Sequence, residues 1–139
     1  MNIRSIIIYG KPLGKKRPKT TTIHGKAKQY TPIETINYEV LIKNVYDEKY
    51  KGKPLFIEAL FSEIMIYKLI PSSISEKKKQ LMEEGIIRPT NTPDIDNVEK
   101  IVKDALNQIA YIDDKQFVES STRAYYSYQP RVEFTFGEL

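Results

Sequence analysis

The strongest pattern in the sequence is an apolar stripe within residues 95–109. Its members recur at i, i+3, i+4, i+7, i+8 and i+11, which is the spacing of one buried helix face: Val98, Ile101, Val102, Ala105, Leu106 and Ile109. Polar residues fall on the opposite side of the same helix: Asn97, Lys100, Asp104 and Gln108. The sequence therefore predicts an amphipathic helix over residues 95–109.

Four other segments predict β-strands. Residues 5–9 form a β-branched run that stops at Gly10, which is typical of a buried first strand. Residues 54–67 predict a long central strand because both of its faces are largely apolar. One face of this strand is expected to carry Leu55, Ile57, Ala59 and Phe61. Residues 116–128 predict a further strand. The last strand alternates, and three of its residues are expected to face the core: Val132, Phe134 and Phe136.

Two more helices and one long loop complete the prediction. Residues 33–50 predict a helix with Thr31 as its cap. Its apolar side is expected to contain Ile36, Val40, Leu41, Val45 and Tyr46. Residues 75–84 predict a short charged helix. Residues 10–32 carry three glycines and three prolines among lysines, and they predict a basic loop. The chain is thus expected to form one compact α+β domain over residues 1–139.

The chain contains no cysteine and a single histidine, His24. This excludes disulfides, cysteine-ligated zinc, iron–sulfur clusters, thiol nucleophiles and a multi-histidine metal site within one chain. Any metal must be held by carboxylates, which favours a hard cation such as Mg²⁺ or Mn²⁺. No apolar run approaches the ~20 residues of a membrane span, and the N-terminus lacks the features of a signal peptide. We therefore expect a soluble, cytoplasmic protein.

The positive charge is concentrated near the N-terminus. Residues 1–33 contain eight Lys or Arg and no Asp or Glu, whereas the other 106 residues carry 14 basic and 18 acidic groups. This separation suggests a polyanion partner held near an acidic centre, although a solvated basic loop explains the charge run equally well. The candidates for contacts with a phosphate backbone are Lys15, Lys16, Arg17, Lys19, Lys26 and Lys28.

A group of aspartates brackets the predicted helix at 95–109. Asp94 and Asp96 are two residues apart, so an extended backbone before the helix would point both carboxylates to the same side. Lys100 follows Asp96 at i+4 and shares its helix face. Asp114 could join them if the strand at 116–128 pairs beside the start of the helix. Three such carboxylates suit Mg²⁺, but helix capping and an ordinary turn account for each one separately.

Four segments together resemble the signature of the RusA family of Holliday-junction resolvases. They are residues 94–100 (Asp-Ile-Asp-Asn-Val-Glu-Lys), 104–107 (Asp-Ala-Leu-Asn), 111–116 (Tyr-Ile-Asp-Asp-Lys-Gln) and 14–18 (Gly-Lys-Lys-Arg-Pro). The resemblance implies a small mixed β-sheet with helices packed on it, in a homodimer. It also implies that Asp94, Asp96 and Asp114 hold the metal and that Lys100 is functional.

The activity implied by the resemblance is Mg²⁺-dependent cleavage of four-way DNA junctions by paired symmetric nicks, in DNA recombination and repair. A phage or prophage origin is implied as well. Two alternatives remain open at the level of sequence. One is a metal-dependent nuclease acting on flaps or forks. The other is a non-catalytic DNA-binding accessory protein of recombination, in which the aspartates serve only as caps and turns.

Overall fold

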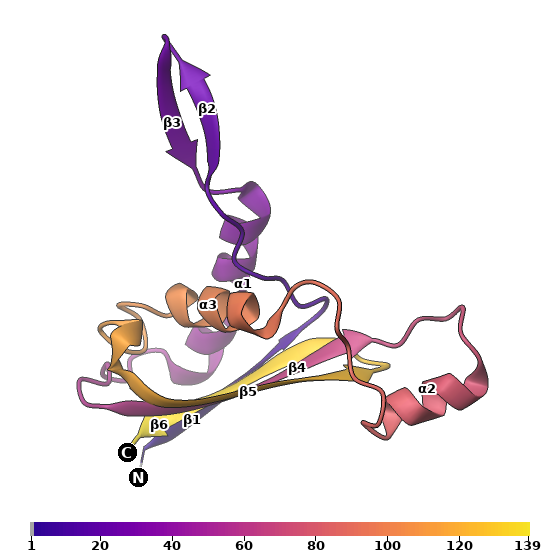
Figure 1. The fold of residues 1–139 in the computed structure, drawn as a ribbon. Coiled ribbons are helices and arrows are strands. Elements are labelled where there is room, and N and C mark those ends of the chain that lie inside the picture. The colour runs from indigo at the N-terminus through magenta and orange to yellow at the C-terminus, as the bar shows by residue number, and fades with distance from the viewer. Residues whose placement is uncertain (1) are drawn as a thin grey trace.

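In the computed structural model, which describes residues 2–139, a four-stranded sheet carries helices on one face (Figure 1). The strand order is β1 (Ile3–Tyr9), β6 (Arg131–Glu138), β4 (Leu60–Leu69) and β5 (Phe117–Ser127). β6 pairs antiparallel with both β1 and β4, whereas β4 and β5 are parallel. The predicted α+β class and mixed sheet are therefore confirmed, and β4 is an interior strand as expected.

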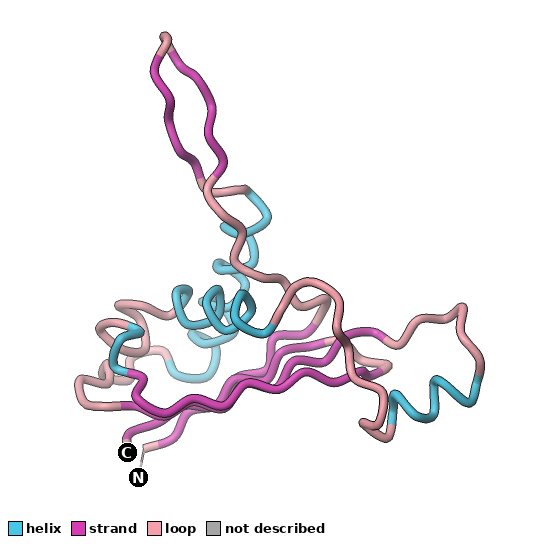
Figure 2. The backbone as a smooth tube through the Cα atoms, in the orientation of Figure 1, coloured by secondary structure: helices cyan, strands magenta, loops and turns pink. Residues whose placement is uncertain are grey.

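Three helices accompany the sheet (Figure 2). α1 (Ile33–Tyr50) and α3 (Ile95–Ala105) pack on the same face, and both lie in the long connections between strands. α2 (Glu76–Glu83) contacts β5 at the opposite end of the molecule from the hairpin described below. The Ser75 side chain caps α2 by accepting from the Lys78 amide at 3.3 Å. Within residues 2–139, no helix is long and apolar enough to cross a bilayer.

The core lies between the sheet and the two helices, α1 and α3. Val132, Phe134 and Phe136 face inward from β6 and are fully buried, which confirms the predicted alternation. The Phe136 ring lies 4.7–6.3 Å, centroid to centroid, from five other aromatic rings: Tyr46, Phe56, Tyr111, Phe117 and Phe134. Offset and edge-on ring pairs of this kind stabilise beyond the apolar area that they bury. This cluster therefore joins α1 and the loop that follows α3 to the sheet.

The prediction for β4 was wrong in its start. The strand begins at Leu60, and its buried residues are Leu60, Ser62, Ile64, Ile66 and Lys68. Leu55 and Ile57, which were expected within the strand, precede it and are exposed. The segment before Leu60 bonds to another loop instead: the Gln116 side chain donates to the carbonyls of Phe56 and Glu58. These contacts take residues 56–58 out of the sheet.

The apolar side of α1 was predicted only in part. Tyr46 is buried and Val45 packs against the core, as expected, whereas Ile36, Val40 and Leu41 are exposed. The other buried residues of the helix are Thr35, Tyr38 and Ile42. The helix carries apolar residues on both sides, so periodicity alone could not identify the inner one. Pro32, rather than Thr31, occupies the N-cap and provides no side-chain hydrogen bond.

Two further elements depart from the prediction. α3 ends at Ala105 instead of Ile109, because Gln108 adopts a φ of 67° and its amide donates to the Tyr111 carbonyl at 2.7 Å. The strand β1 lies at the edge of the sheet and is buried on only one side. Ile6 and Ile8 face the core, whereas Ile7 is exposed on the other face.

The predicted basic loop at residues 10–32 contains a β-hairpin. β2 (Lys19–Ile23) and β3 (Lys26–Tyr30) pair antiparallel and stand away from the body of the protein (Figure 1). The two connecting residues, His24 and Gly25, have φ values of 51° and 74°, as a tight two-residue hairpin turn requires. Every residue of both strands is exposed.

We predict that Phe136→Ala lowers the free energy of unfolding by about 3–5 kcal/mol, because it leaves a cavity among five aromatic rings. Urea denaturation followed by circular dichroism measures the change. Val118→Ala, at a side chain that is 61% exposed, is the control and should shift the value by less than about 0.5 kcal/mol. Equal effects of the two substitutions would contradict the assignment of the core.

Candidate functional site

Asp94 caps the N-terminus of α3. Its backbone is extended, with φ −75° and ψ 167°, and its carboxylate accepts from the Asn97 amide at 3.0 Å. The capping role that the sequence left open is therefore real for Asp94. The bond engages Oδ1, and both Asp94 and Asp96 are exposed at the first turn of the helix. Capping and ligand binding are compatible at this position, since a carboxylate has several acceptor sites.

The basic N-terminal segment lies directly against this end of α3. The Lys15 amide donates to the Asn97 carbonyl at 2.9 Å. A Cβ placed on Gly14 would lie 2.8 Å from the Pro93 Cβ and 2.9 Å from the Asn97 Cβ, so only glycine allows this approach. The two segments line an open groove of about 340 Å³, and both Asp94 and Lys16 are among its lining residues.

Lys68, on the inward side of β4, holds the loop that leads to Asp94. Its ammonium donates to the carbonyls of Asn91 at 2.5 Å and Pro93 at 2.7 Å. The residue is 9% exposed, and burial lowers the pKa of its ammonium while the charge of Asp94 opposes that shift. Lys68 thus holds the backbone of residues 91–93, which directly precede Asp94.

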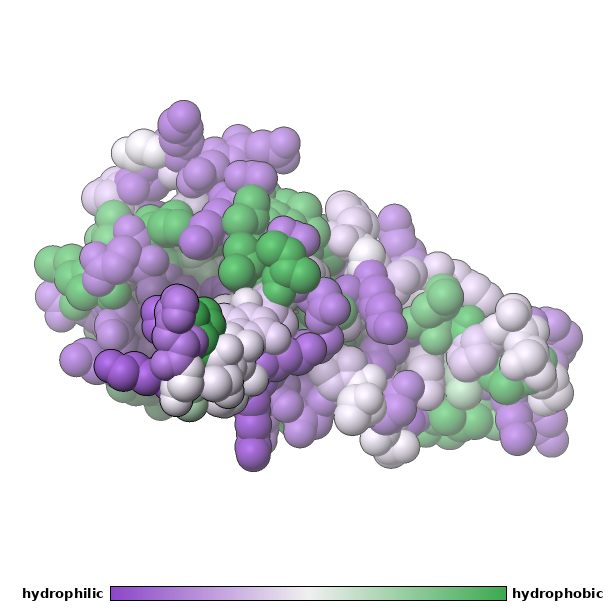
Figure 3. Space-filling view, turned by 90° about the horizontal axis from the view of Figure 1, so that it is seen from above, coloured by the Kyte–Doolittle hydropathy of each residue, from purple (hydrophilic) through white to green (hydrophobic). Residues whose placement is uncertain are grey.

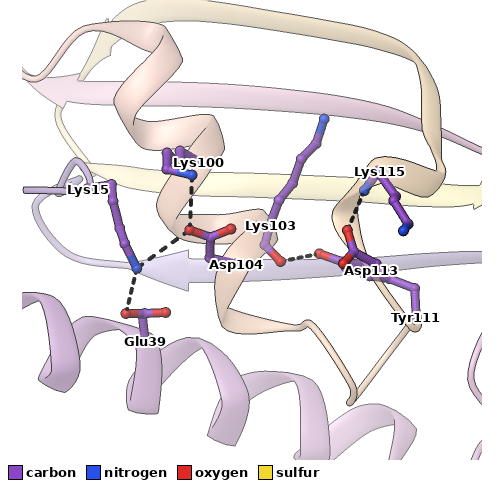
Figure 4. A network of polar contacts seen from close by, with 8 residues as sticks. All are labelled: Lys15, Glu39, Lys100, Lys103, Asp104, Tyr111, Asp113 and Lys115. Atoms are coloured by element: carbon purple, nitrogen blue, oxygen red, sulfur yellow. Dashed lines mark hydrogen bonds and ion pairs between the residues drawn. The ribbon is translucent and has the colours of Figure 1, made fainter.

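A second acidic group lies at the other end of α3 (Figure 4). Asp104 forms ion pairs with Lys15 and Lys100, each at 3.5 Å. Asp114 begins a short 3-10 turn that Asp113 caps. Burial raises the pKa of Asp114, and the nearby carboxyl groups of Asp113 and Asp104 raise it further. Negative charge is therefore poorly compensated at Asp114.

The structure does not assemble the predicted triad in one place. Asp114 lies beside Asp104, whereas Asp94 and Asp96 are at the start of the helix. Asp96 and Asp104 are separated by eight residues, or about 12 Å along the helix axis. Within residues 2–139, no three acidic or histidine side chains converge closely enough to hold a metal ion. The assignment of Asp94, Asp96 and Asp114 as ligands therefore stays a prediction.

The donor groups nevertheless fit a hard divalent cation. Asp104 and Asp114 approach each other closely enough to perturb the Asp114 pKa, and a cation between them would relieve their repulsion. Mg²⁺ commonly uses only one or two carboxylates and completes its shell with water and substrate phosphate. The chemistry of the donors thus matches the ion that the sequence predicted.

Sequence reasoning did not select Asp104 or Lys68 as site residues. Asp104 was assigned only to the polar side of its helix, although its i+4 spacing from Lys100 and i+8 spacing from Asp96 put all three on one face. Lys68 is a lone cation in an apolar strand. The predicted strand ended at residue 67, before Lys68. Because β4 continues to Leu69, its alternation places Lys68 at an inward position, where a charge needs partners.

The predicted DNA-binding residues fall into two groups. Lys15 is paired with Glu39 at 3.2 Å as well as with Asp104, and Lys16 is paired with Glu34. The side-chain hydrogen bond from Lys16 is the main cause of a lowered Glu34 pKa. The other four candidates are exposed on or beside the hairpin: Arg17, Lys19, Lys26 and Lys28.

Carboxylates at both ends of α3, with a basic segment packed against its first turn, fit the class of enzymes that act on nucleic acid backbones. Residues 9–136 match the family model described as "Endodeoxyribonuclease RusA". The chain is also 32% identical to the "Uncharacterized protein YqaN" of Bacillus subtilis (strain 168), over 100% of this chain and 99% of the relative. The chain therefore belongs to the RusA family of endodeoxyribonucleases, which are Holliday-junction resolvases.

We predict that Asp104→Asn lowers the pKa of Asp114, because one of the carboxyl groups that raise it is removed. Part of the elevation should persist, since burial is its largest cause. Carboxyl ¹³C chemical shifts measured against pH report the change. Asp47→Asn, at a carboxyl group that is not among the causes of the Asp114 shift, should leave the Asp114 titration unchanged. An identical Asp114 pKa in wild type and Asp104→Asn would contradict the contact.

Proposed function

We propose that this enzyme resolves four-way DNA junctions by paired symmetric nicks and that it depends on Mg²⁺, for which Mn²⁺ can substitute. Membership of the RusA family supports the junction substrate. The observation that carries the proposal is the groove between the basic segment and the start of α3, which lies next to Asp94. There a DNA phosphate can meet both a cationic wall and carboxylates. A role in recombination and a phage or prophage origin accompany the proposal.

In this proposal the metal ligands are Asp94, Asp96 and Asp114, as predicted from the sequence. They provide carboxylates at two places, with Asp94 and Asp96 at the start of α3 and Asp114 beside Asp104 at its other end. A divalent cation held by these carboxylates would neutralise charge on the scissile phosphate and lower the pKa of a bound water. Lys100 stabilises negative charge on the phosphate, and its 3.5 Å ion pair with Asp104 keeps it on this face of the helix. Lys68 orients Asp94 through the preceding backbone.

The homodimer is part of the proposal, and α1 provides a surface for it. Four residues spaced at i, i+3, i+7 and i+8 form an outer stripe on this helix: Ile33, Ile36, Val40 and Leu41. They are 41–65% exposed. Apolar residues form exposed patches on the helix-bearing side of the molecule (Figure 3). A second copy that covers the outer stripe by twofold symmetry would remove this apolar area from water.

Asp94→Asn tests the metal site without removing the helix cap, because Asn and Asp are equally good N-caps. We expect junction cleavage to fall by roughly 100-fold or more, while the free energy of unfolding changes by less than about 0.5 kcal/mol. A labelled four-way junction, beside linear duplex and flap controls, is incubated with Mg²⁺ or EDTA and analysed on denaturing gels.

Asp113→Asn is the matched control for this experiment, since it also replaces a capping carboxylate. We expect it to retain more activity than Asp94→Asn. Full cleavage by Asp94→Asn would refute the ligand role. Preferential cleavage of flaps would favour the alternative nuclease. Junction binding without cleavage in any divalent metal would favour the non-catalytic accessory protein.

We predict that Ile36→Glu combined with Val40→Glu converts the dimer to monomer, because two charges cannot be buried unpaired in an apolar contact. Sedimentation velocity should show twice the chain mass for wild type and the single-chain mass for the double variant. Ile57→Glu, at a side chain that is 67% exposed outside α1, should remain dimeric. A dimer that survives the double substitution would exclude the outer stripe as the contact.

A further inference from the structure

The hairpin formed by β2 and β3 has two chemically different faces. Directly paired residues of an antiparallel ladder share a face, so the pairs Lys19–Tyr30, Thr21–Lys28 and Ile23–Lys26 lie together. We call this the lysine face. The pairs Thr20–Gln29 and Thr22–Ala27 form the opposite, neutral face. All three lysines of the hairpin strands are therefore presented on the same side.

The hairpin is not explained by packing within the chain. Its strands are exposed throughout, and both figures of the backbone show it standing away from the sheet and the helices (Figures 1 and 2). An isolated two-stranded hairpin is at best marginally stable in water. The hairpin contributes no residue to the core, and its lysines are aligned on one face. Both features indicate that it contacts a negatively charged partner.

The hairpin starts close to the acidic helix. Gly14 and Lys15 are fixed on the first turn of α3, and β2 begins only four residues after Lys15. Five residues of each strand extend the ribbon by about 17 Å, which corresponds to about five base pairs of B-form DNA. DNA bound at the groove beside Asp94 would thus have its adjoining duplex within reach of the ribbon.

We propose that the lysine face binds the phosphate backbone of the duplex arm next to the cleavage site, without reading its sequence. Lys15 and Lys16 are engaged in ion pairs with Glu39, Asp104 and Glu34, so they serve this purpose less well than the hairpin lysines. The proposal rests on the proposed function, because it assumes that the DNA enters the groove beside Asp94. It adds an arm-binding element that is separate from the catalytic groups.

The test is binding of fluorescent four-way junctions in EDTA, measured by anisotropy against salt concentration. The variant carries Lys19→Gln, Lys26→Gln and Lys28→Gln, and circular dichroism confirms its fold. We expect roughly tenfold weaker binding and a log–log salt slope that is smaller by up to about 2.7, as three lost phosphate contacts require. The matched control removes three exposed lysines elsewhere: Lys51→Gln, Lys77→Gln and Lys78→Gln.

Arm length provides the second readout. Wild type should bind junctions with arms of about 20 base pairs more tightly than junctions with arms of about 6, because short arms end near the ribbon. The triple hairpin variant should lose this preference, and the control variant should keep it. An unchanged salt slope, or a preference that survives in the hairpin variant, would overturn the proposal. Failure of wild type to cleave any junction in Mg²⁺ would instead refute the proposed function and leave these binding results intact.

Discussion

The close approach of Gly14 to the first turn of α3 determines how the functional parts of this protein are arranged. Any larger residue would collide with Pro93 and Asn97, and the Lys15 amide completes the contact by bonding to the Asn97 carbonyl. The contact joins the segment that leads to the hairpin to the helix that carries the acidic residues. The Lys15–Asp104 ion pair is a second link between the same two parts.

The helix α3 distributes charge along one side at intervals of one turn. Asp96, Lys100 and Asp104 follow each other at i+4, so a cation lies between two anions. The ion pairs of Lys100 and Lys15 with Asp104 are partly solvated and contribute little to stability. Their value lies in orientation, since they keep two ammonium groups beside the carboxyl group of Asp104.

The sequence predicted buried residues correctly in the elements that have a single apolar side. The alternation of β6 and the apolar stripe of α3 identified buried residues correctly, because each element has one apolar side. β4 failed because residues 54–59 are apolar yet bond to the loop containing Gln116. The hairpin was missed because His24-Gly25 is not among the dipeptides that commonly signal a tight turn, although histidine tolerates a positive φ better than most residues. The proximity of Asp104 to Asp114 depends on the tertiary path after α3, which no local pattern encodes.

A nuclease must bring a polyanion to a site made of carboxylates, although phosphate and carboxylate groups repel each other. The structure offers two ways to overcome this repulsion, one at longer and one at shorter range. At physiological salt, charges are screened beyond about 8 Å, so attraction must come from cations close to the site. The Lys15 region and the hairpin provide such cations within one continuous segment.

At shorter range the carboxylates themselves still repel phosphate. The raised pKa of Asp114 identifies the place where that repulsion is least compensated, and a divalent cation bound there would remove it. Asp94, whose carboxylate already accepts a hydrogen bond from the helix, is better satisfied in the free protein. At the Asp104–Asp114 end of α3, a bound cation would therefore relieve repulsion between carboxyl groups.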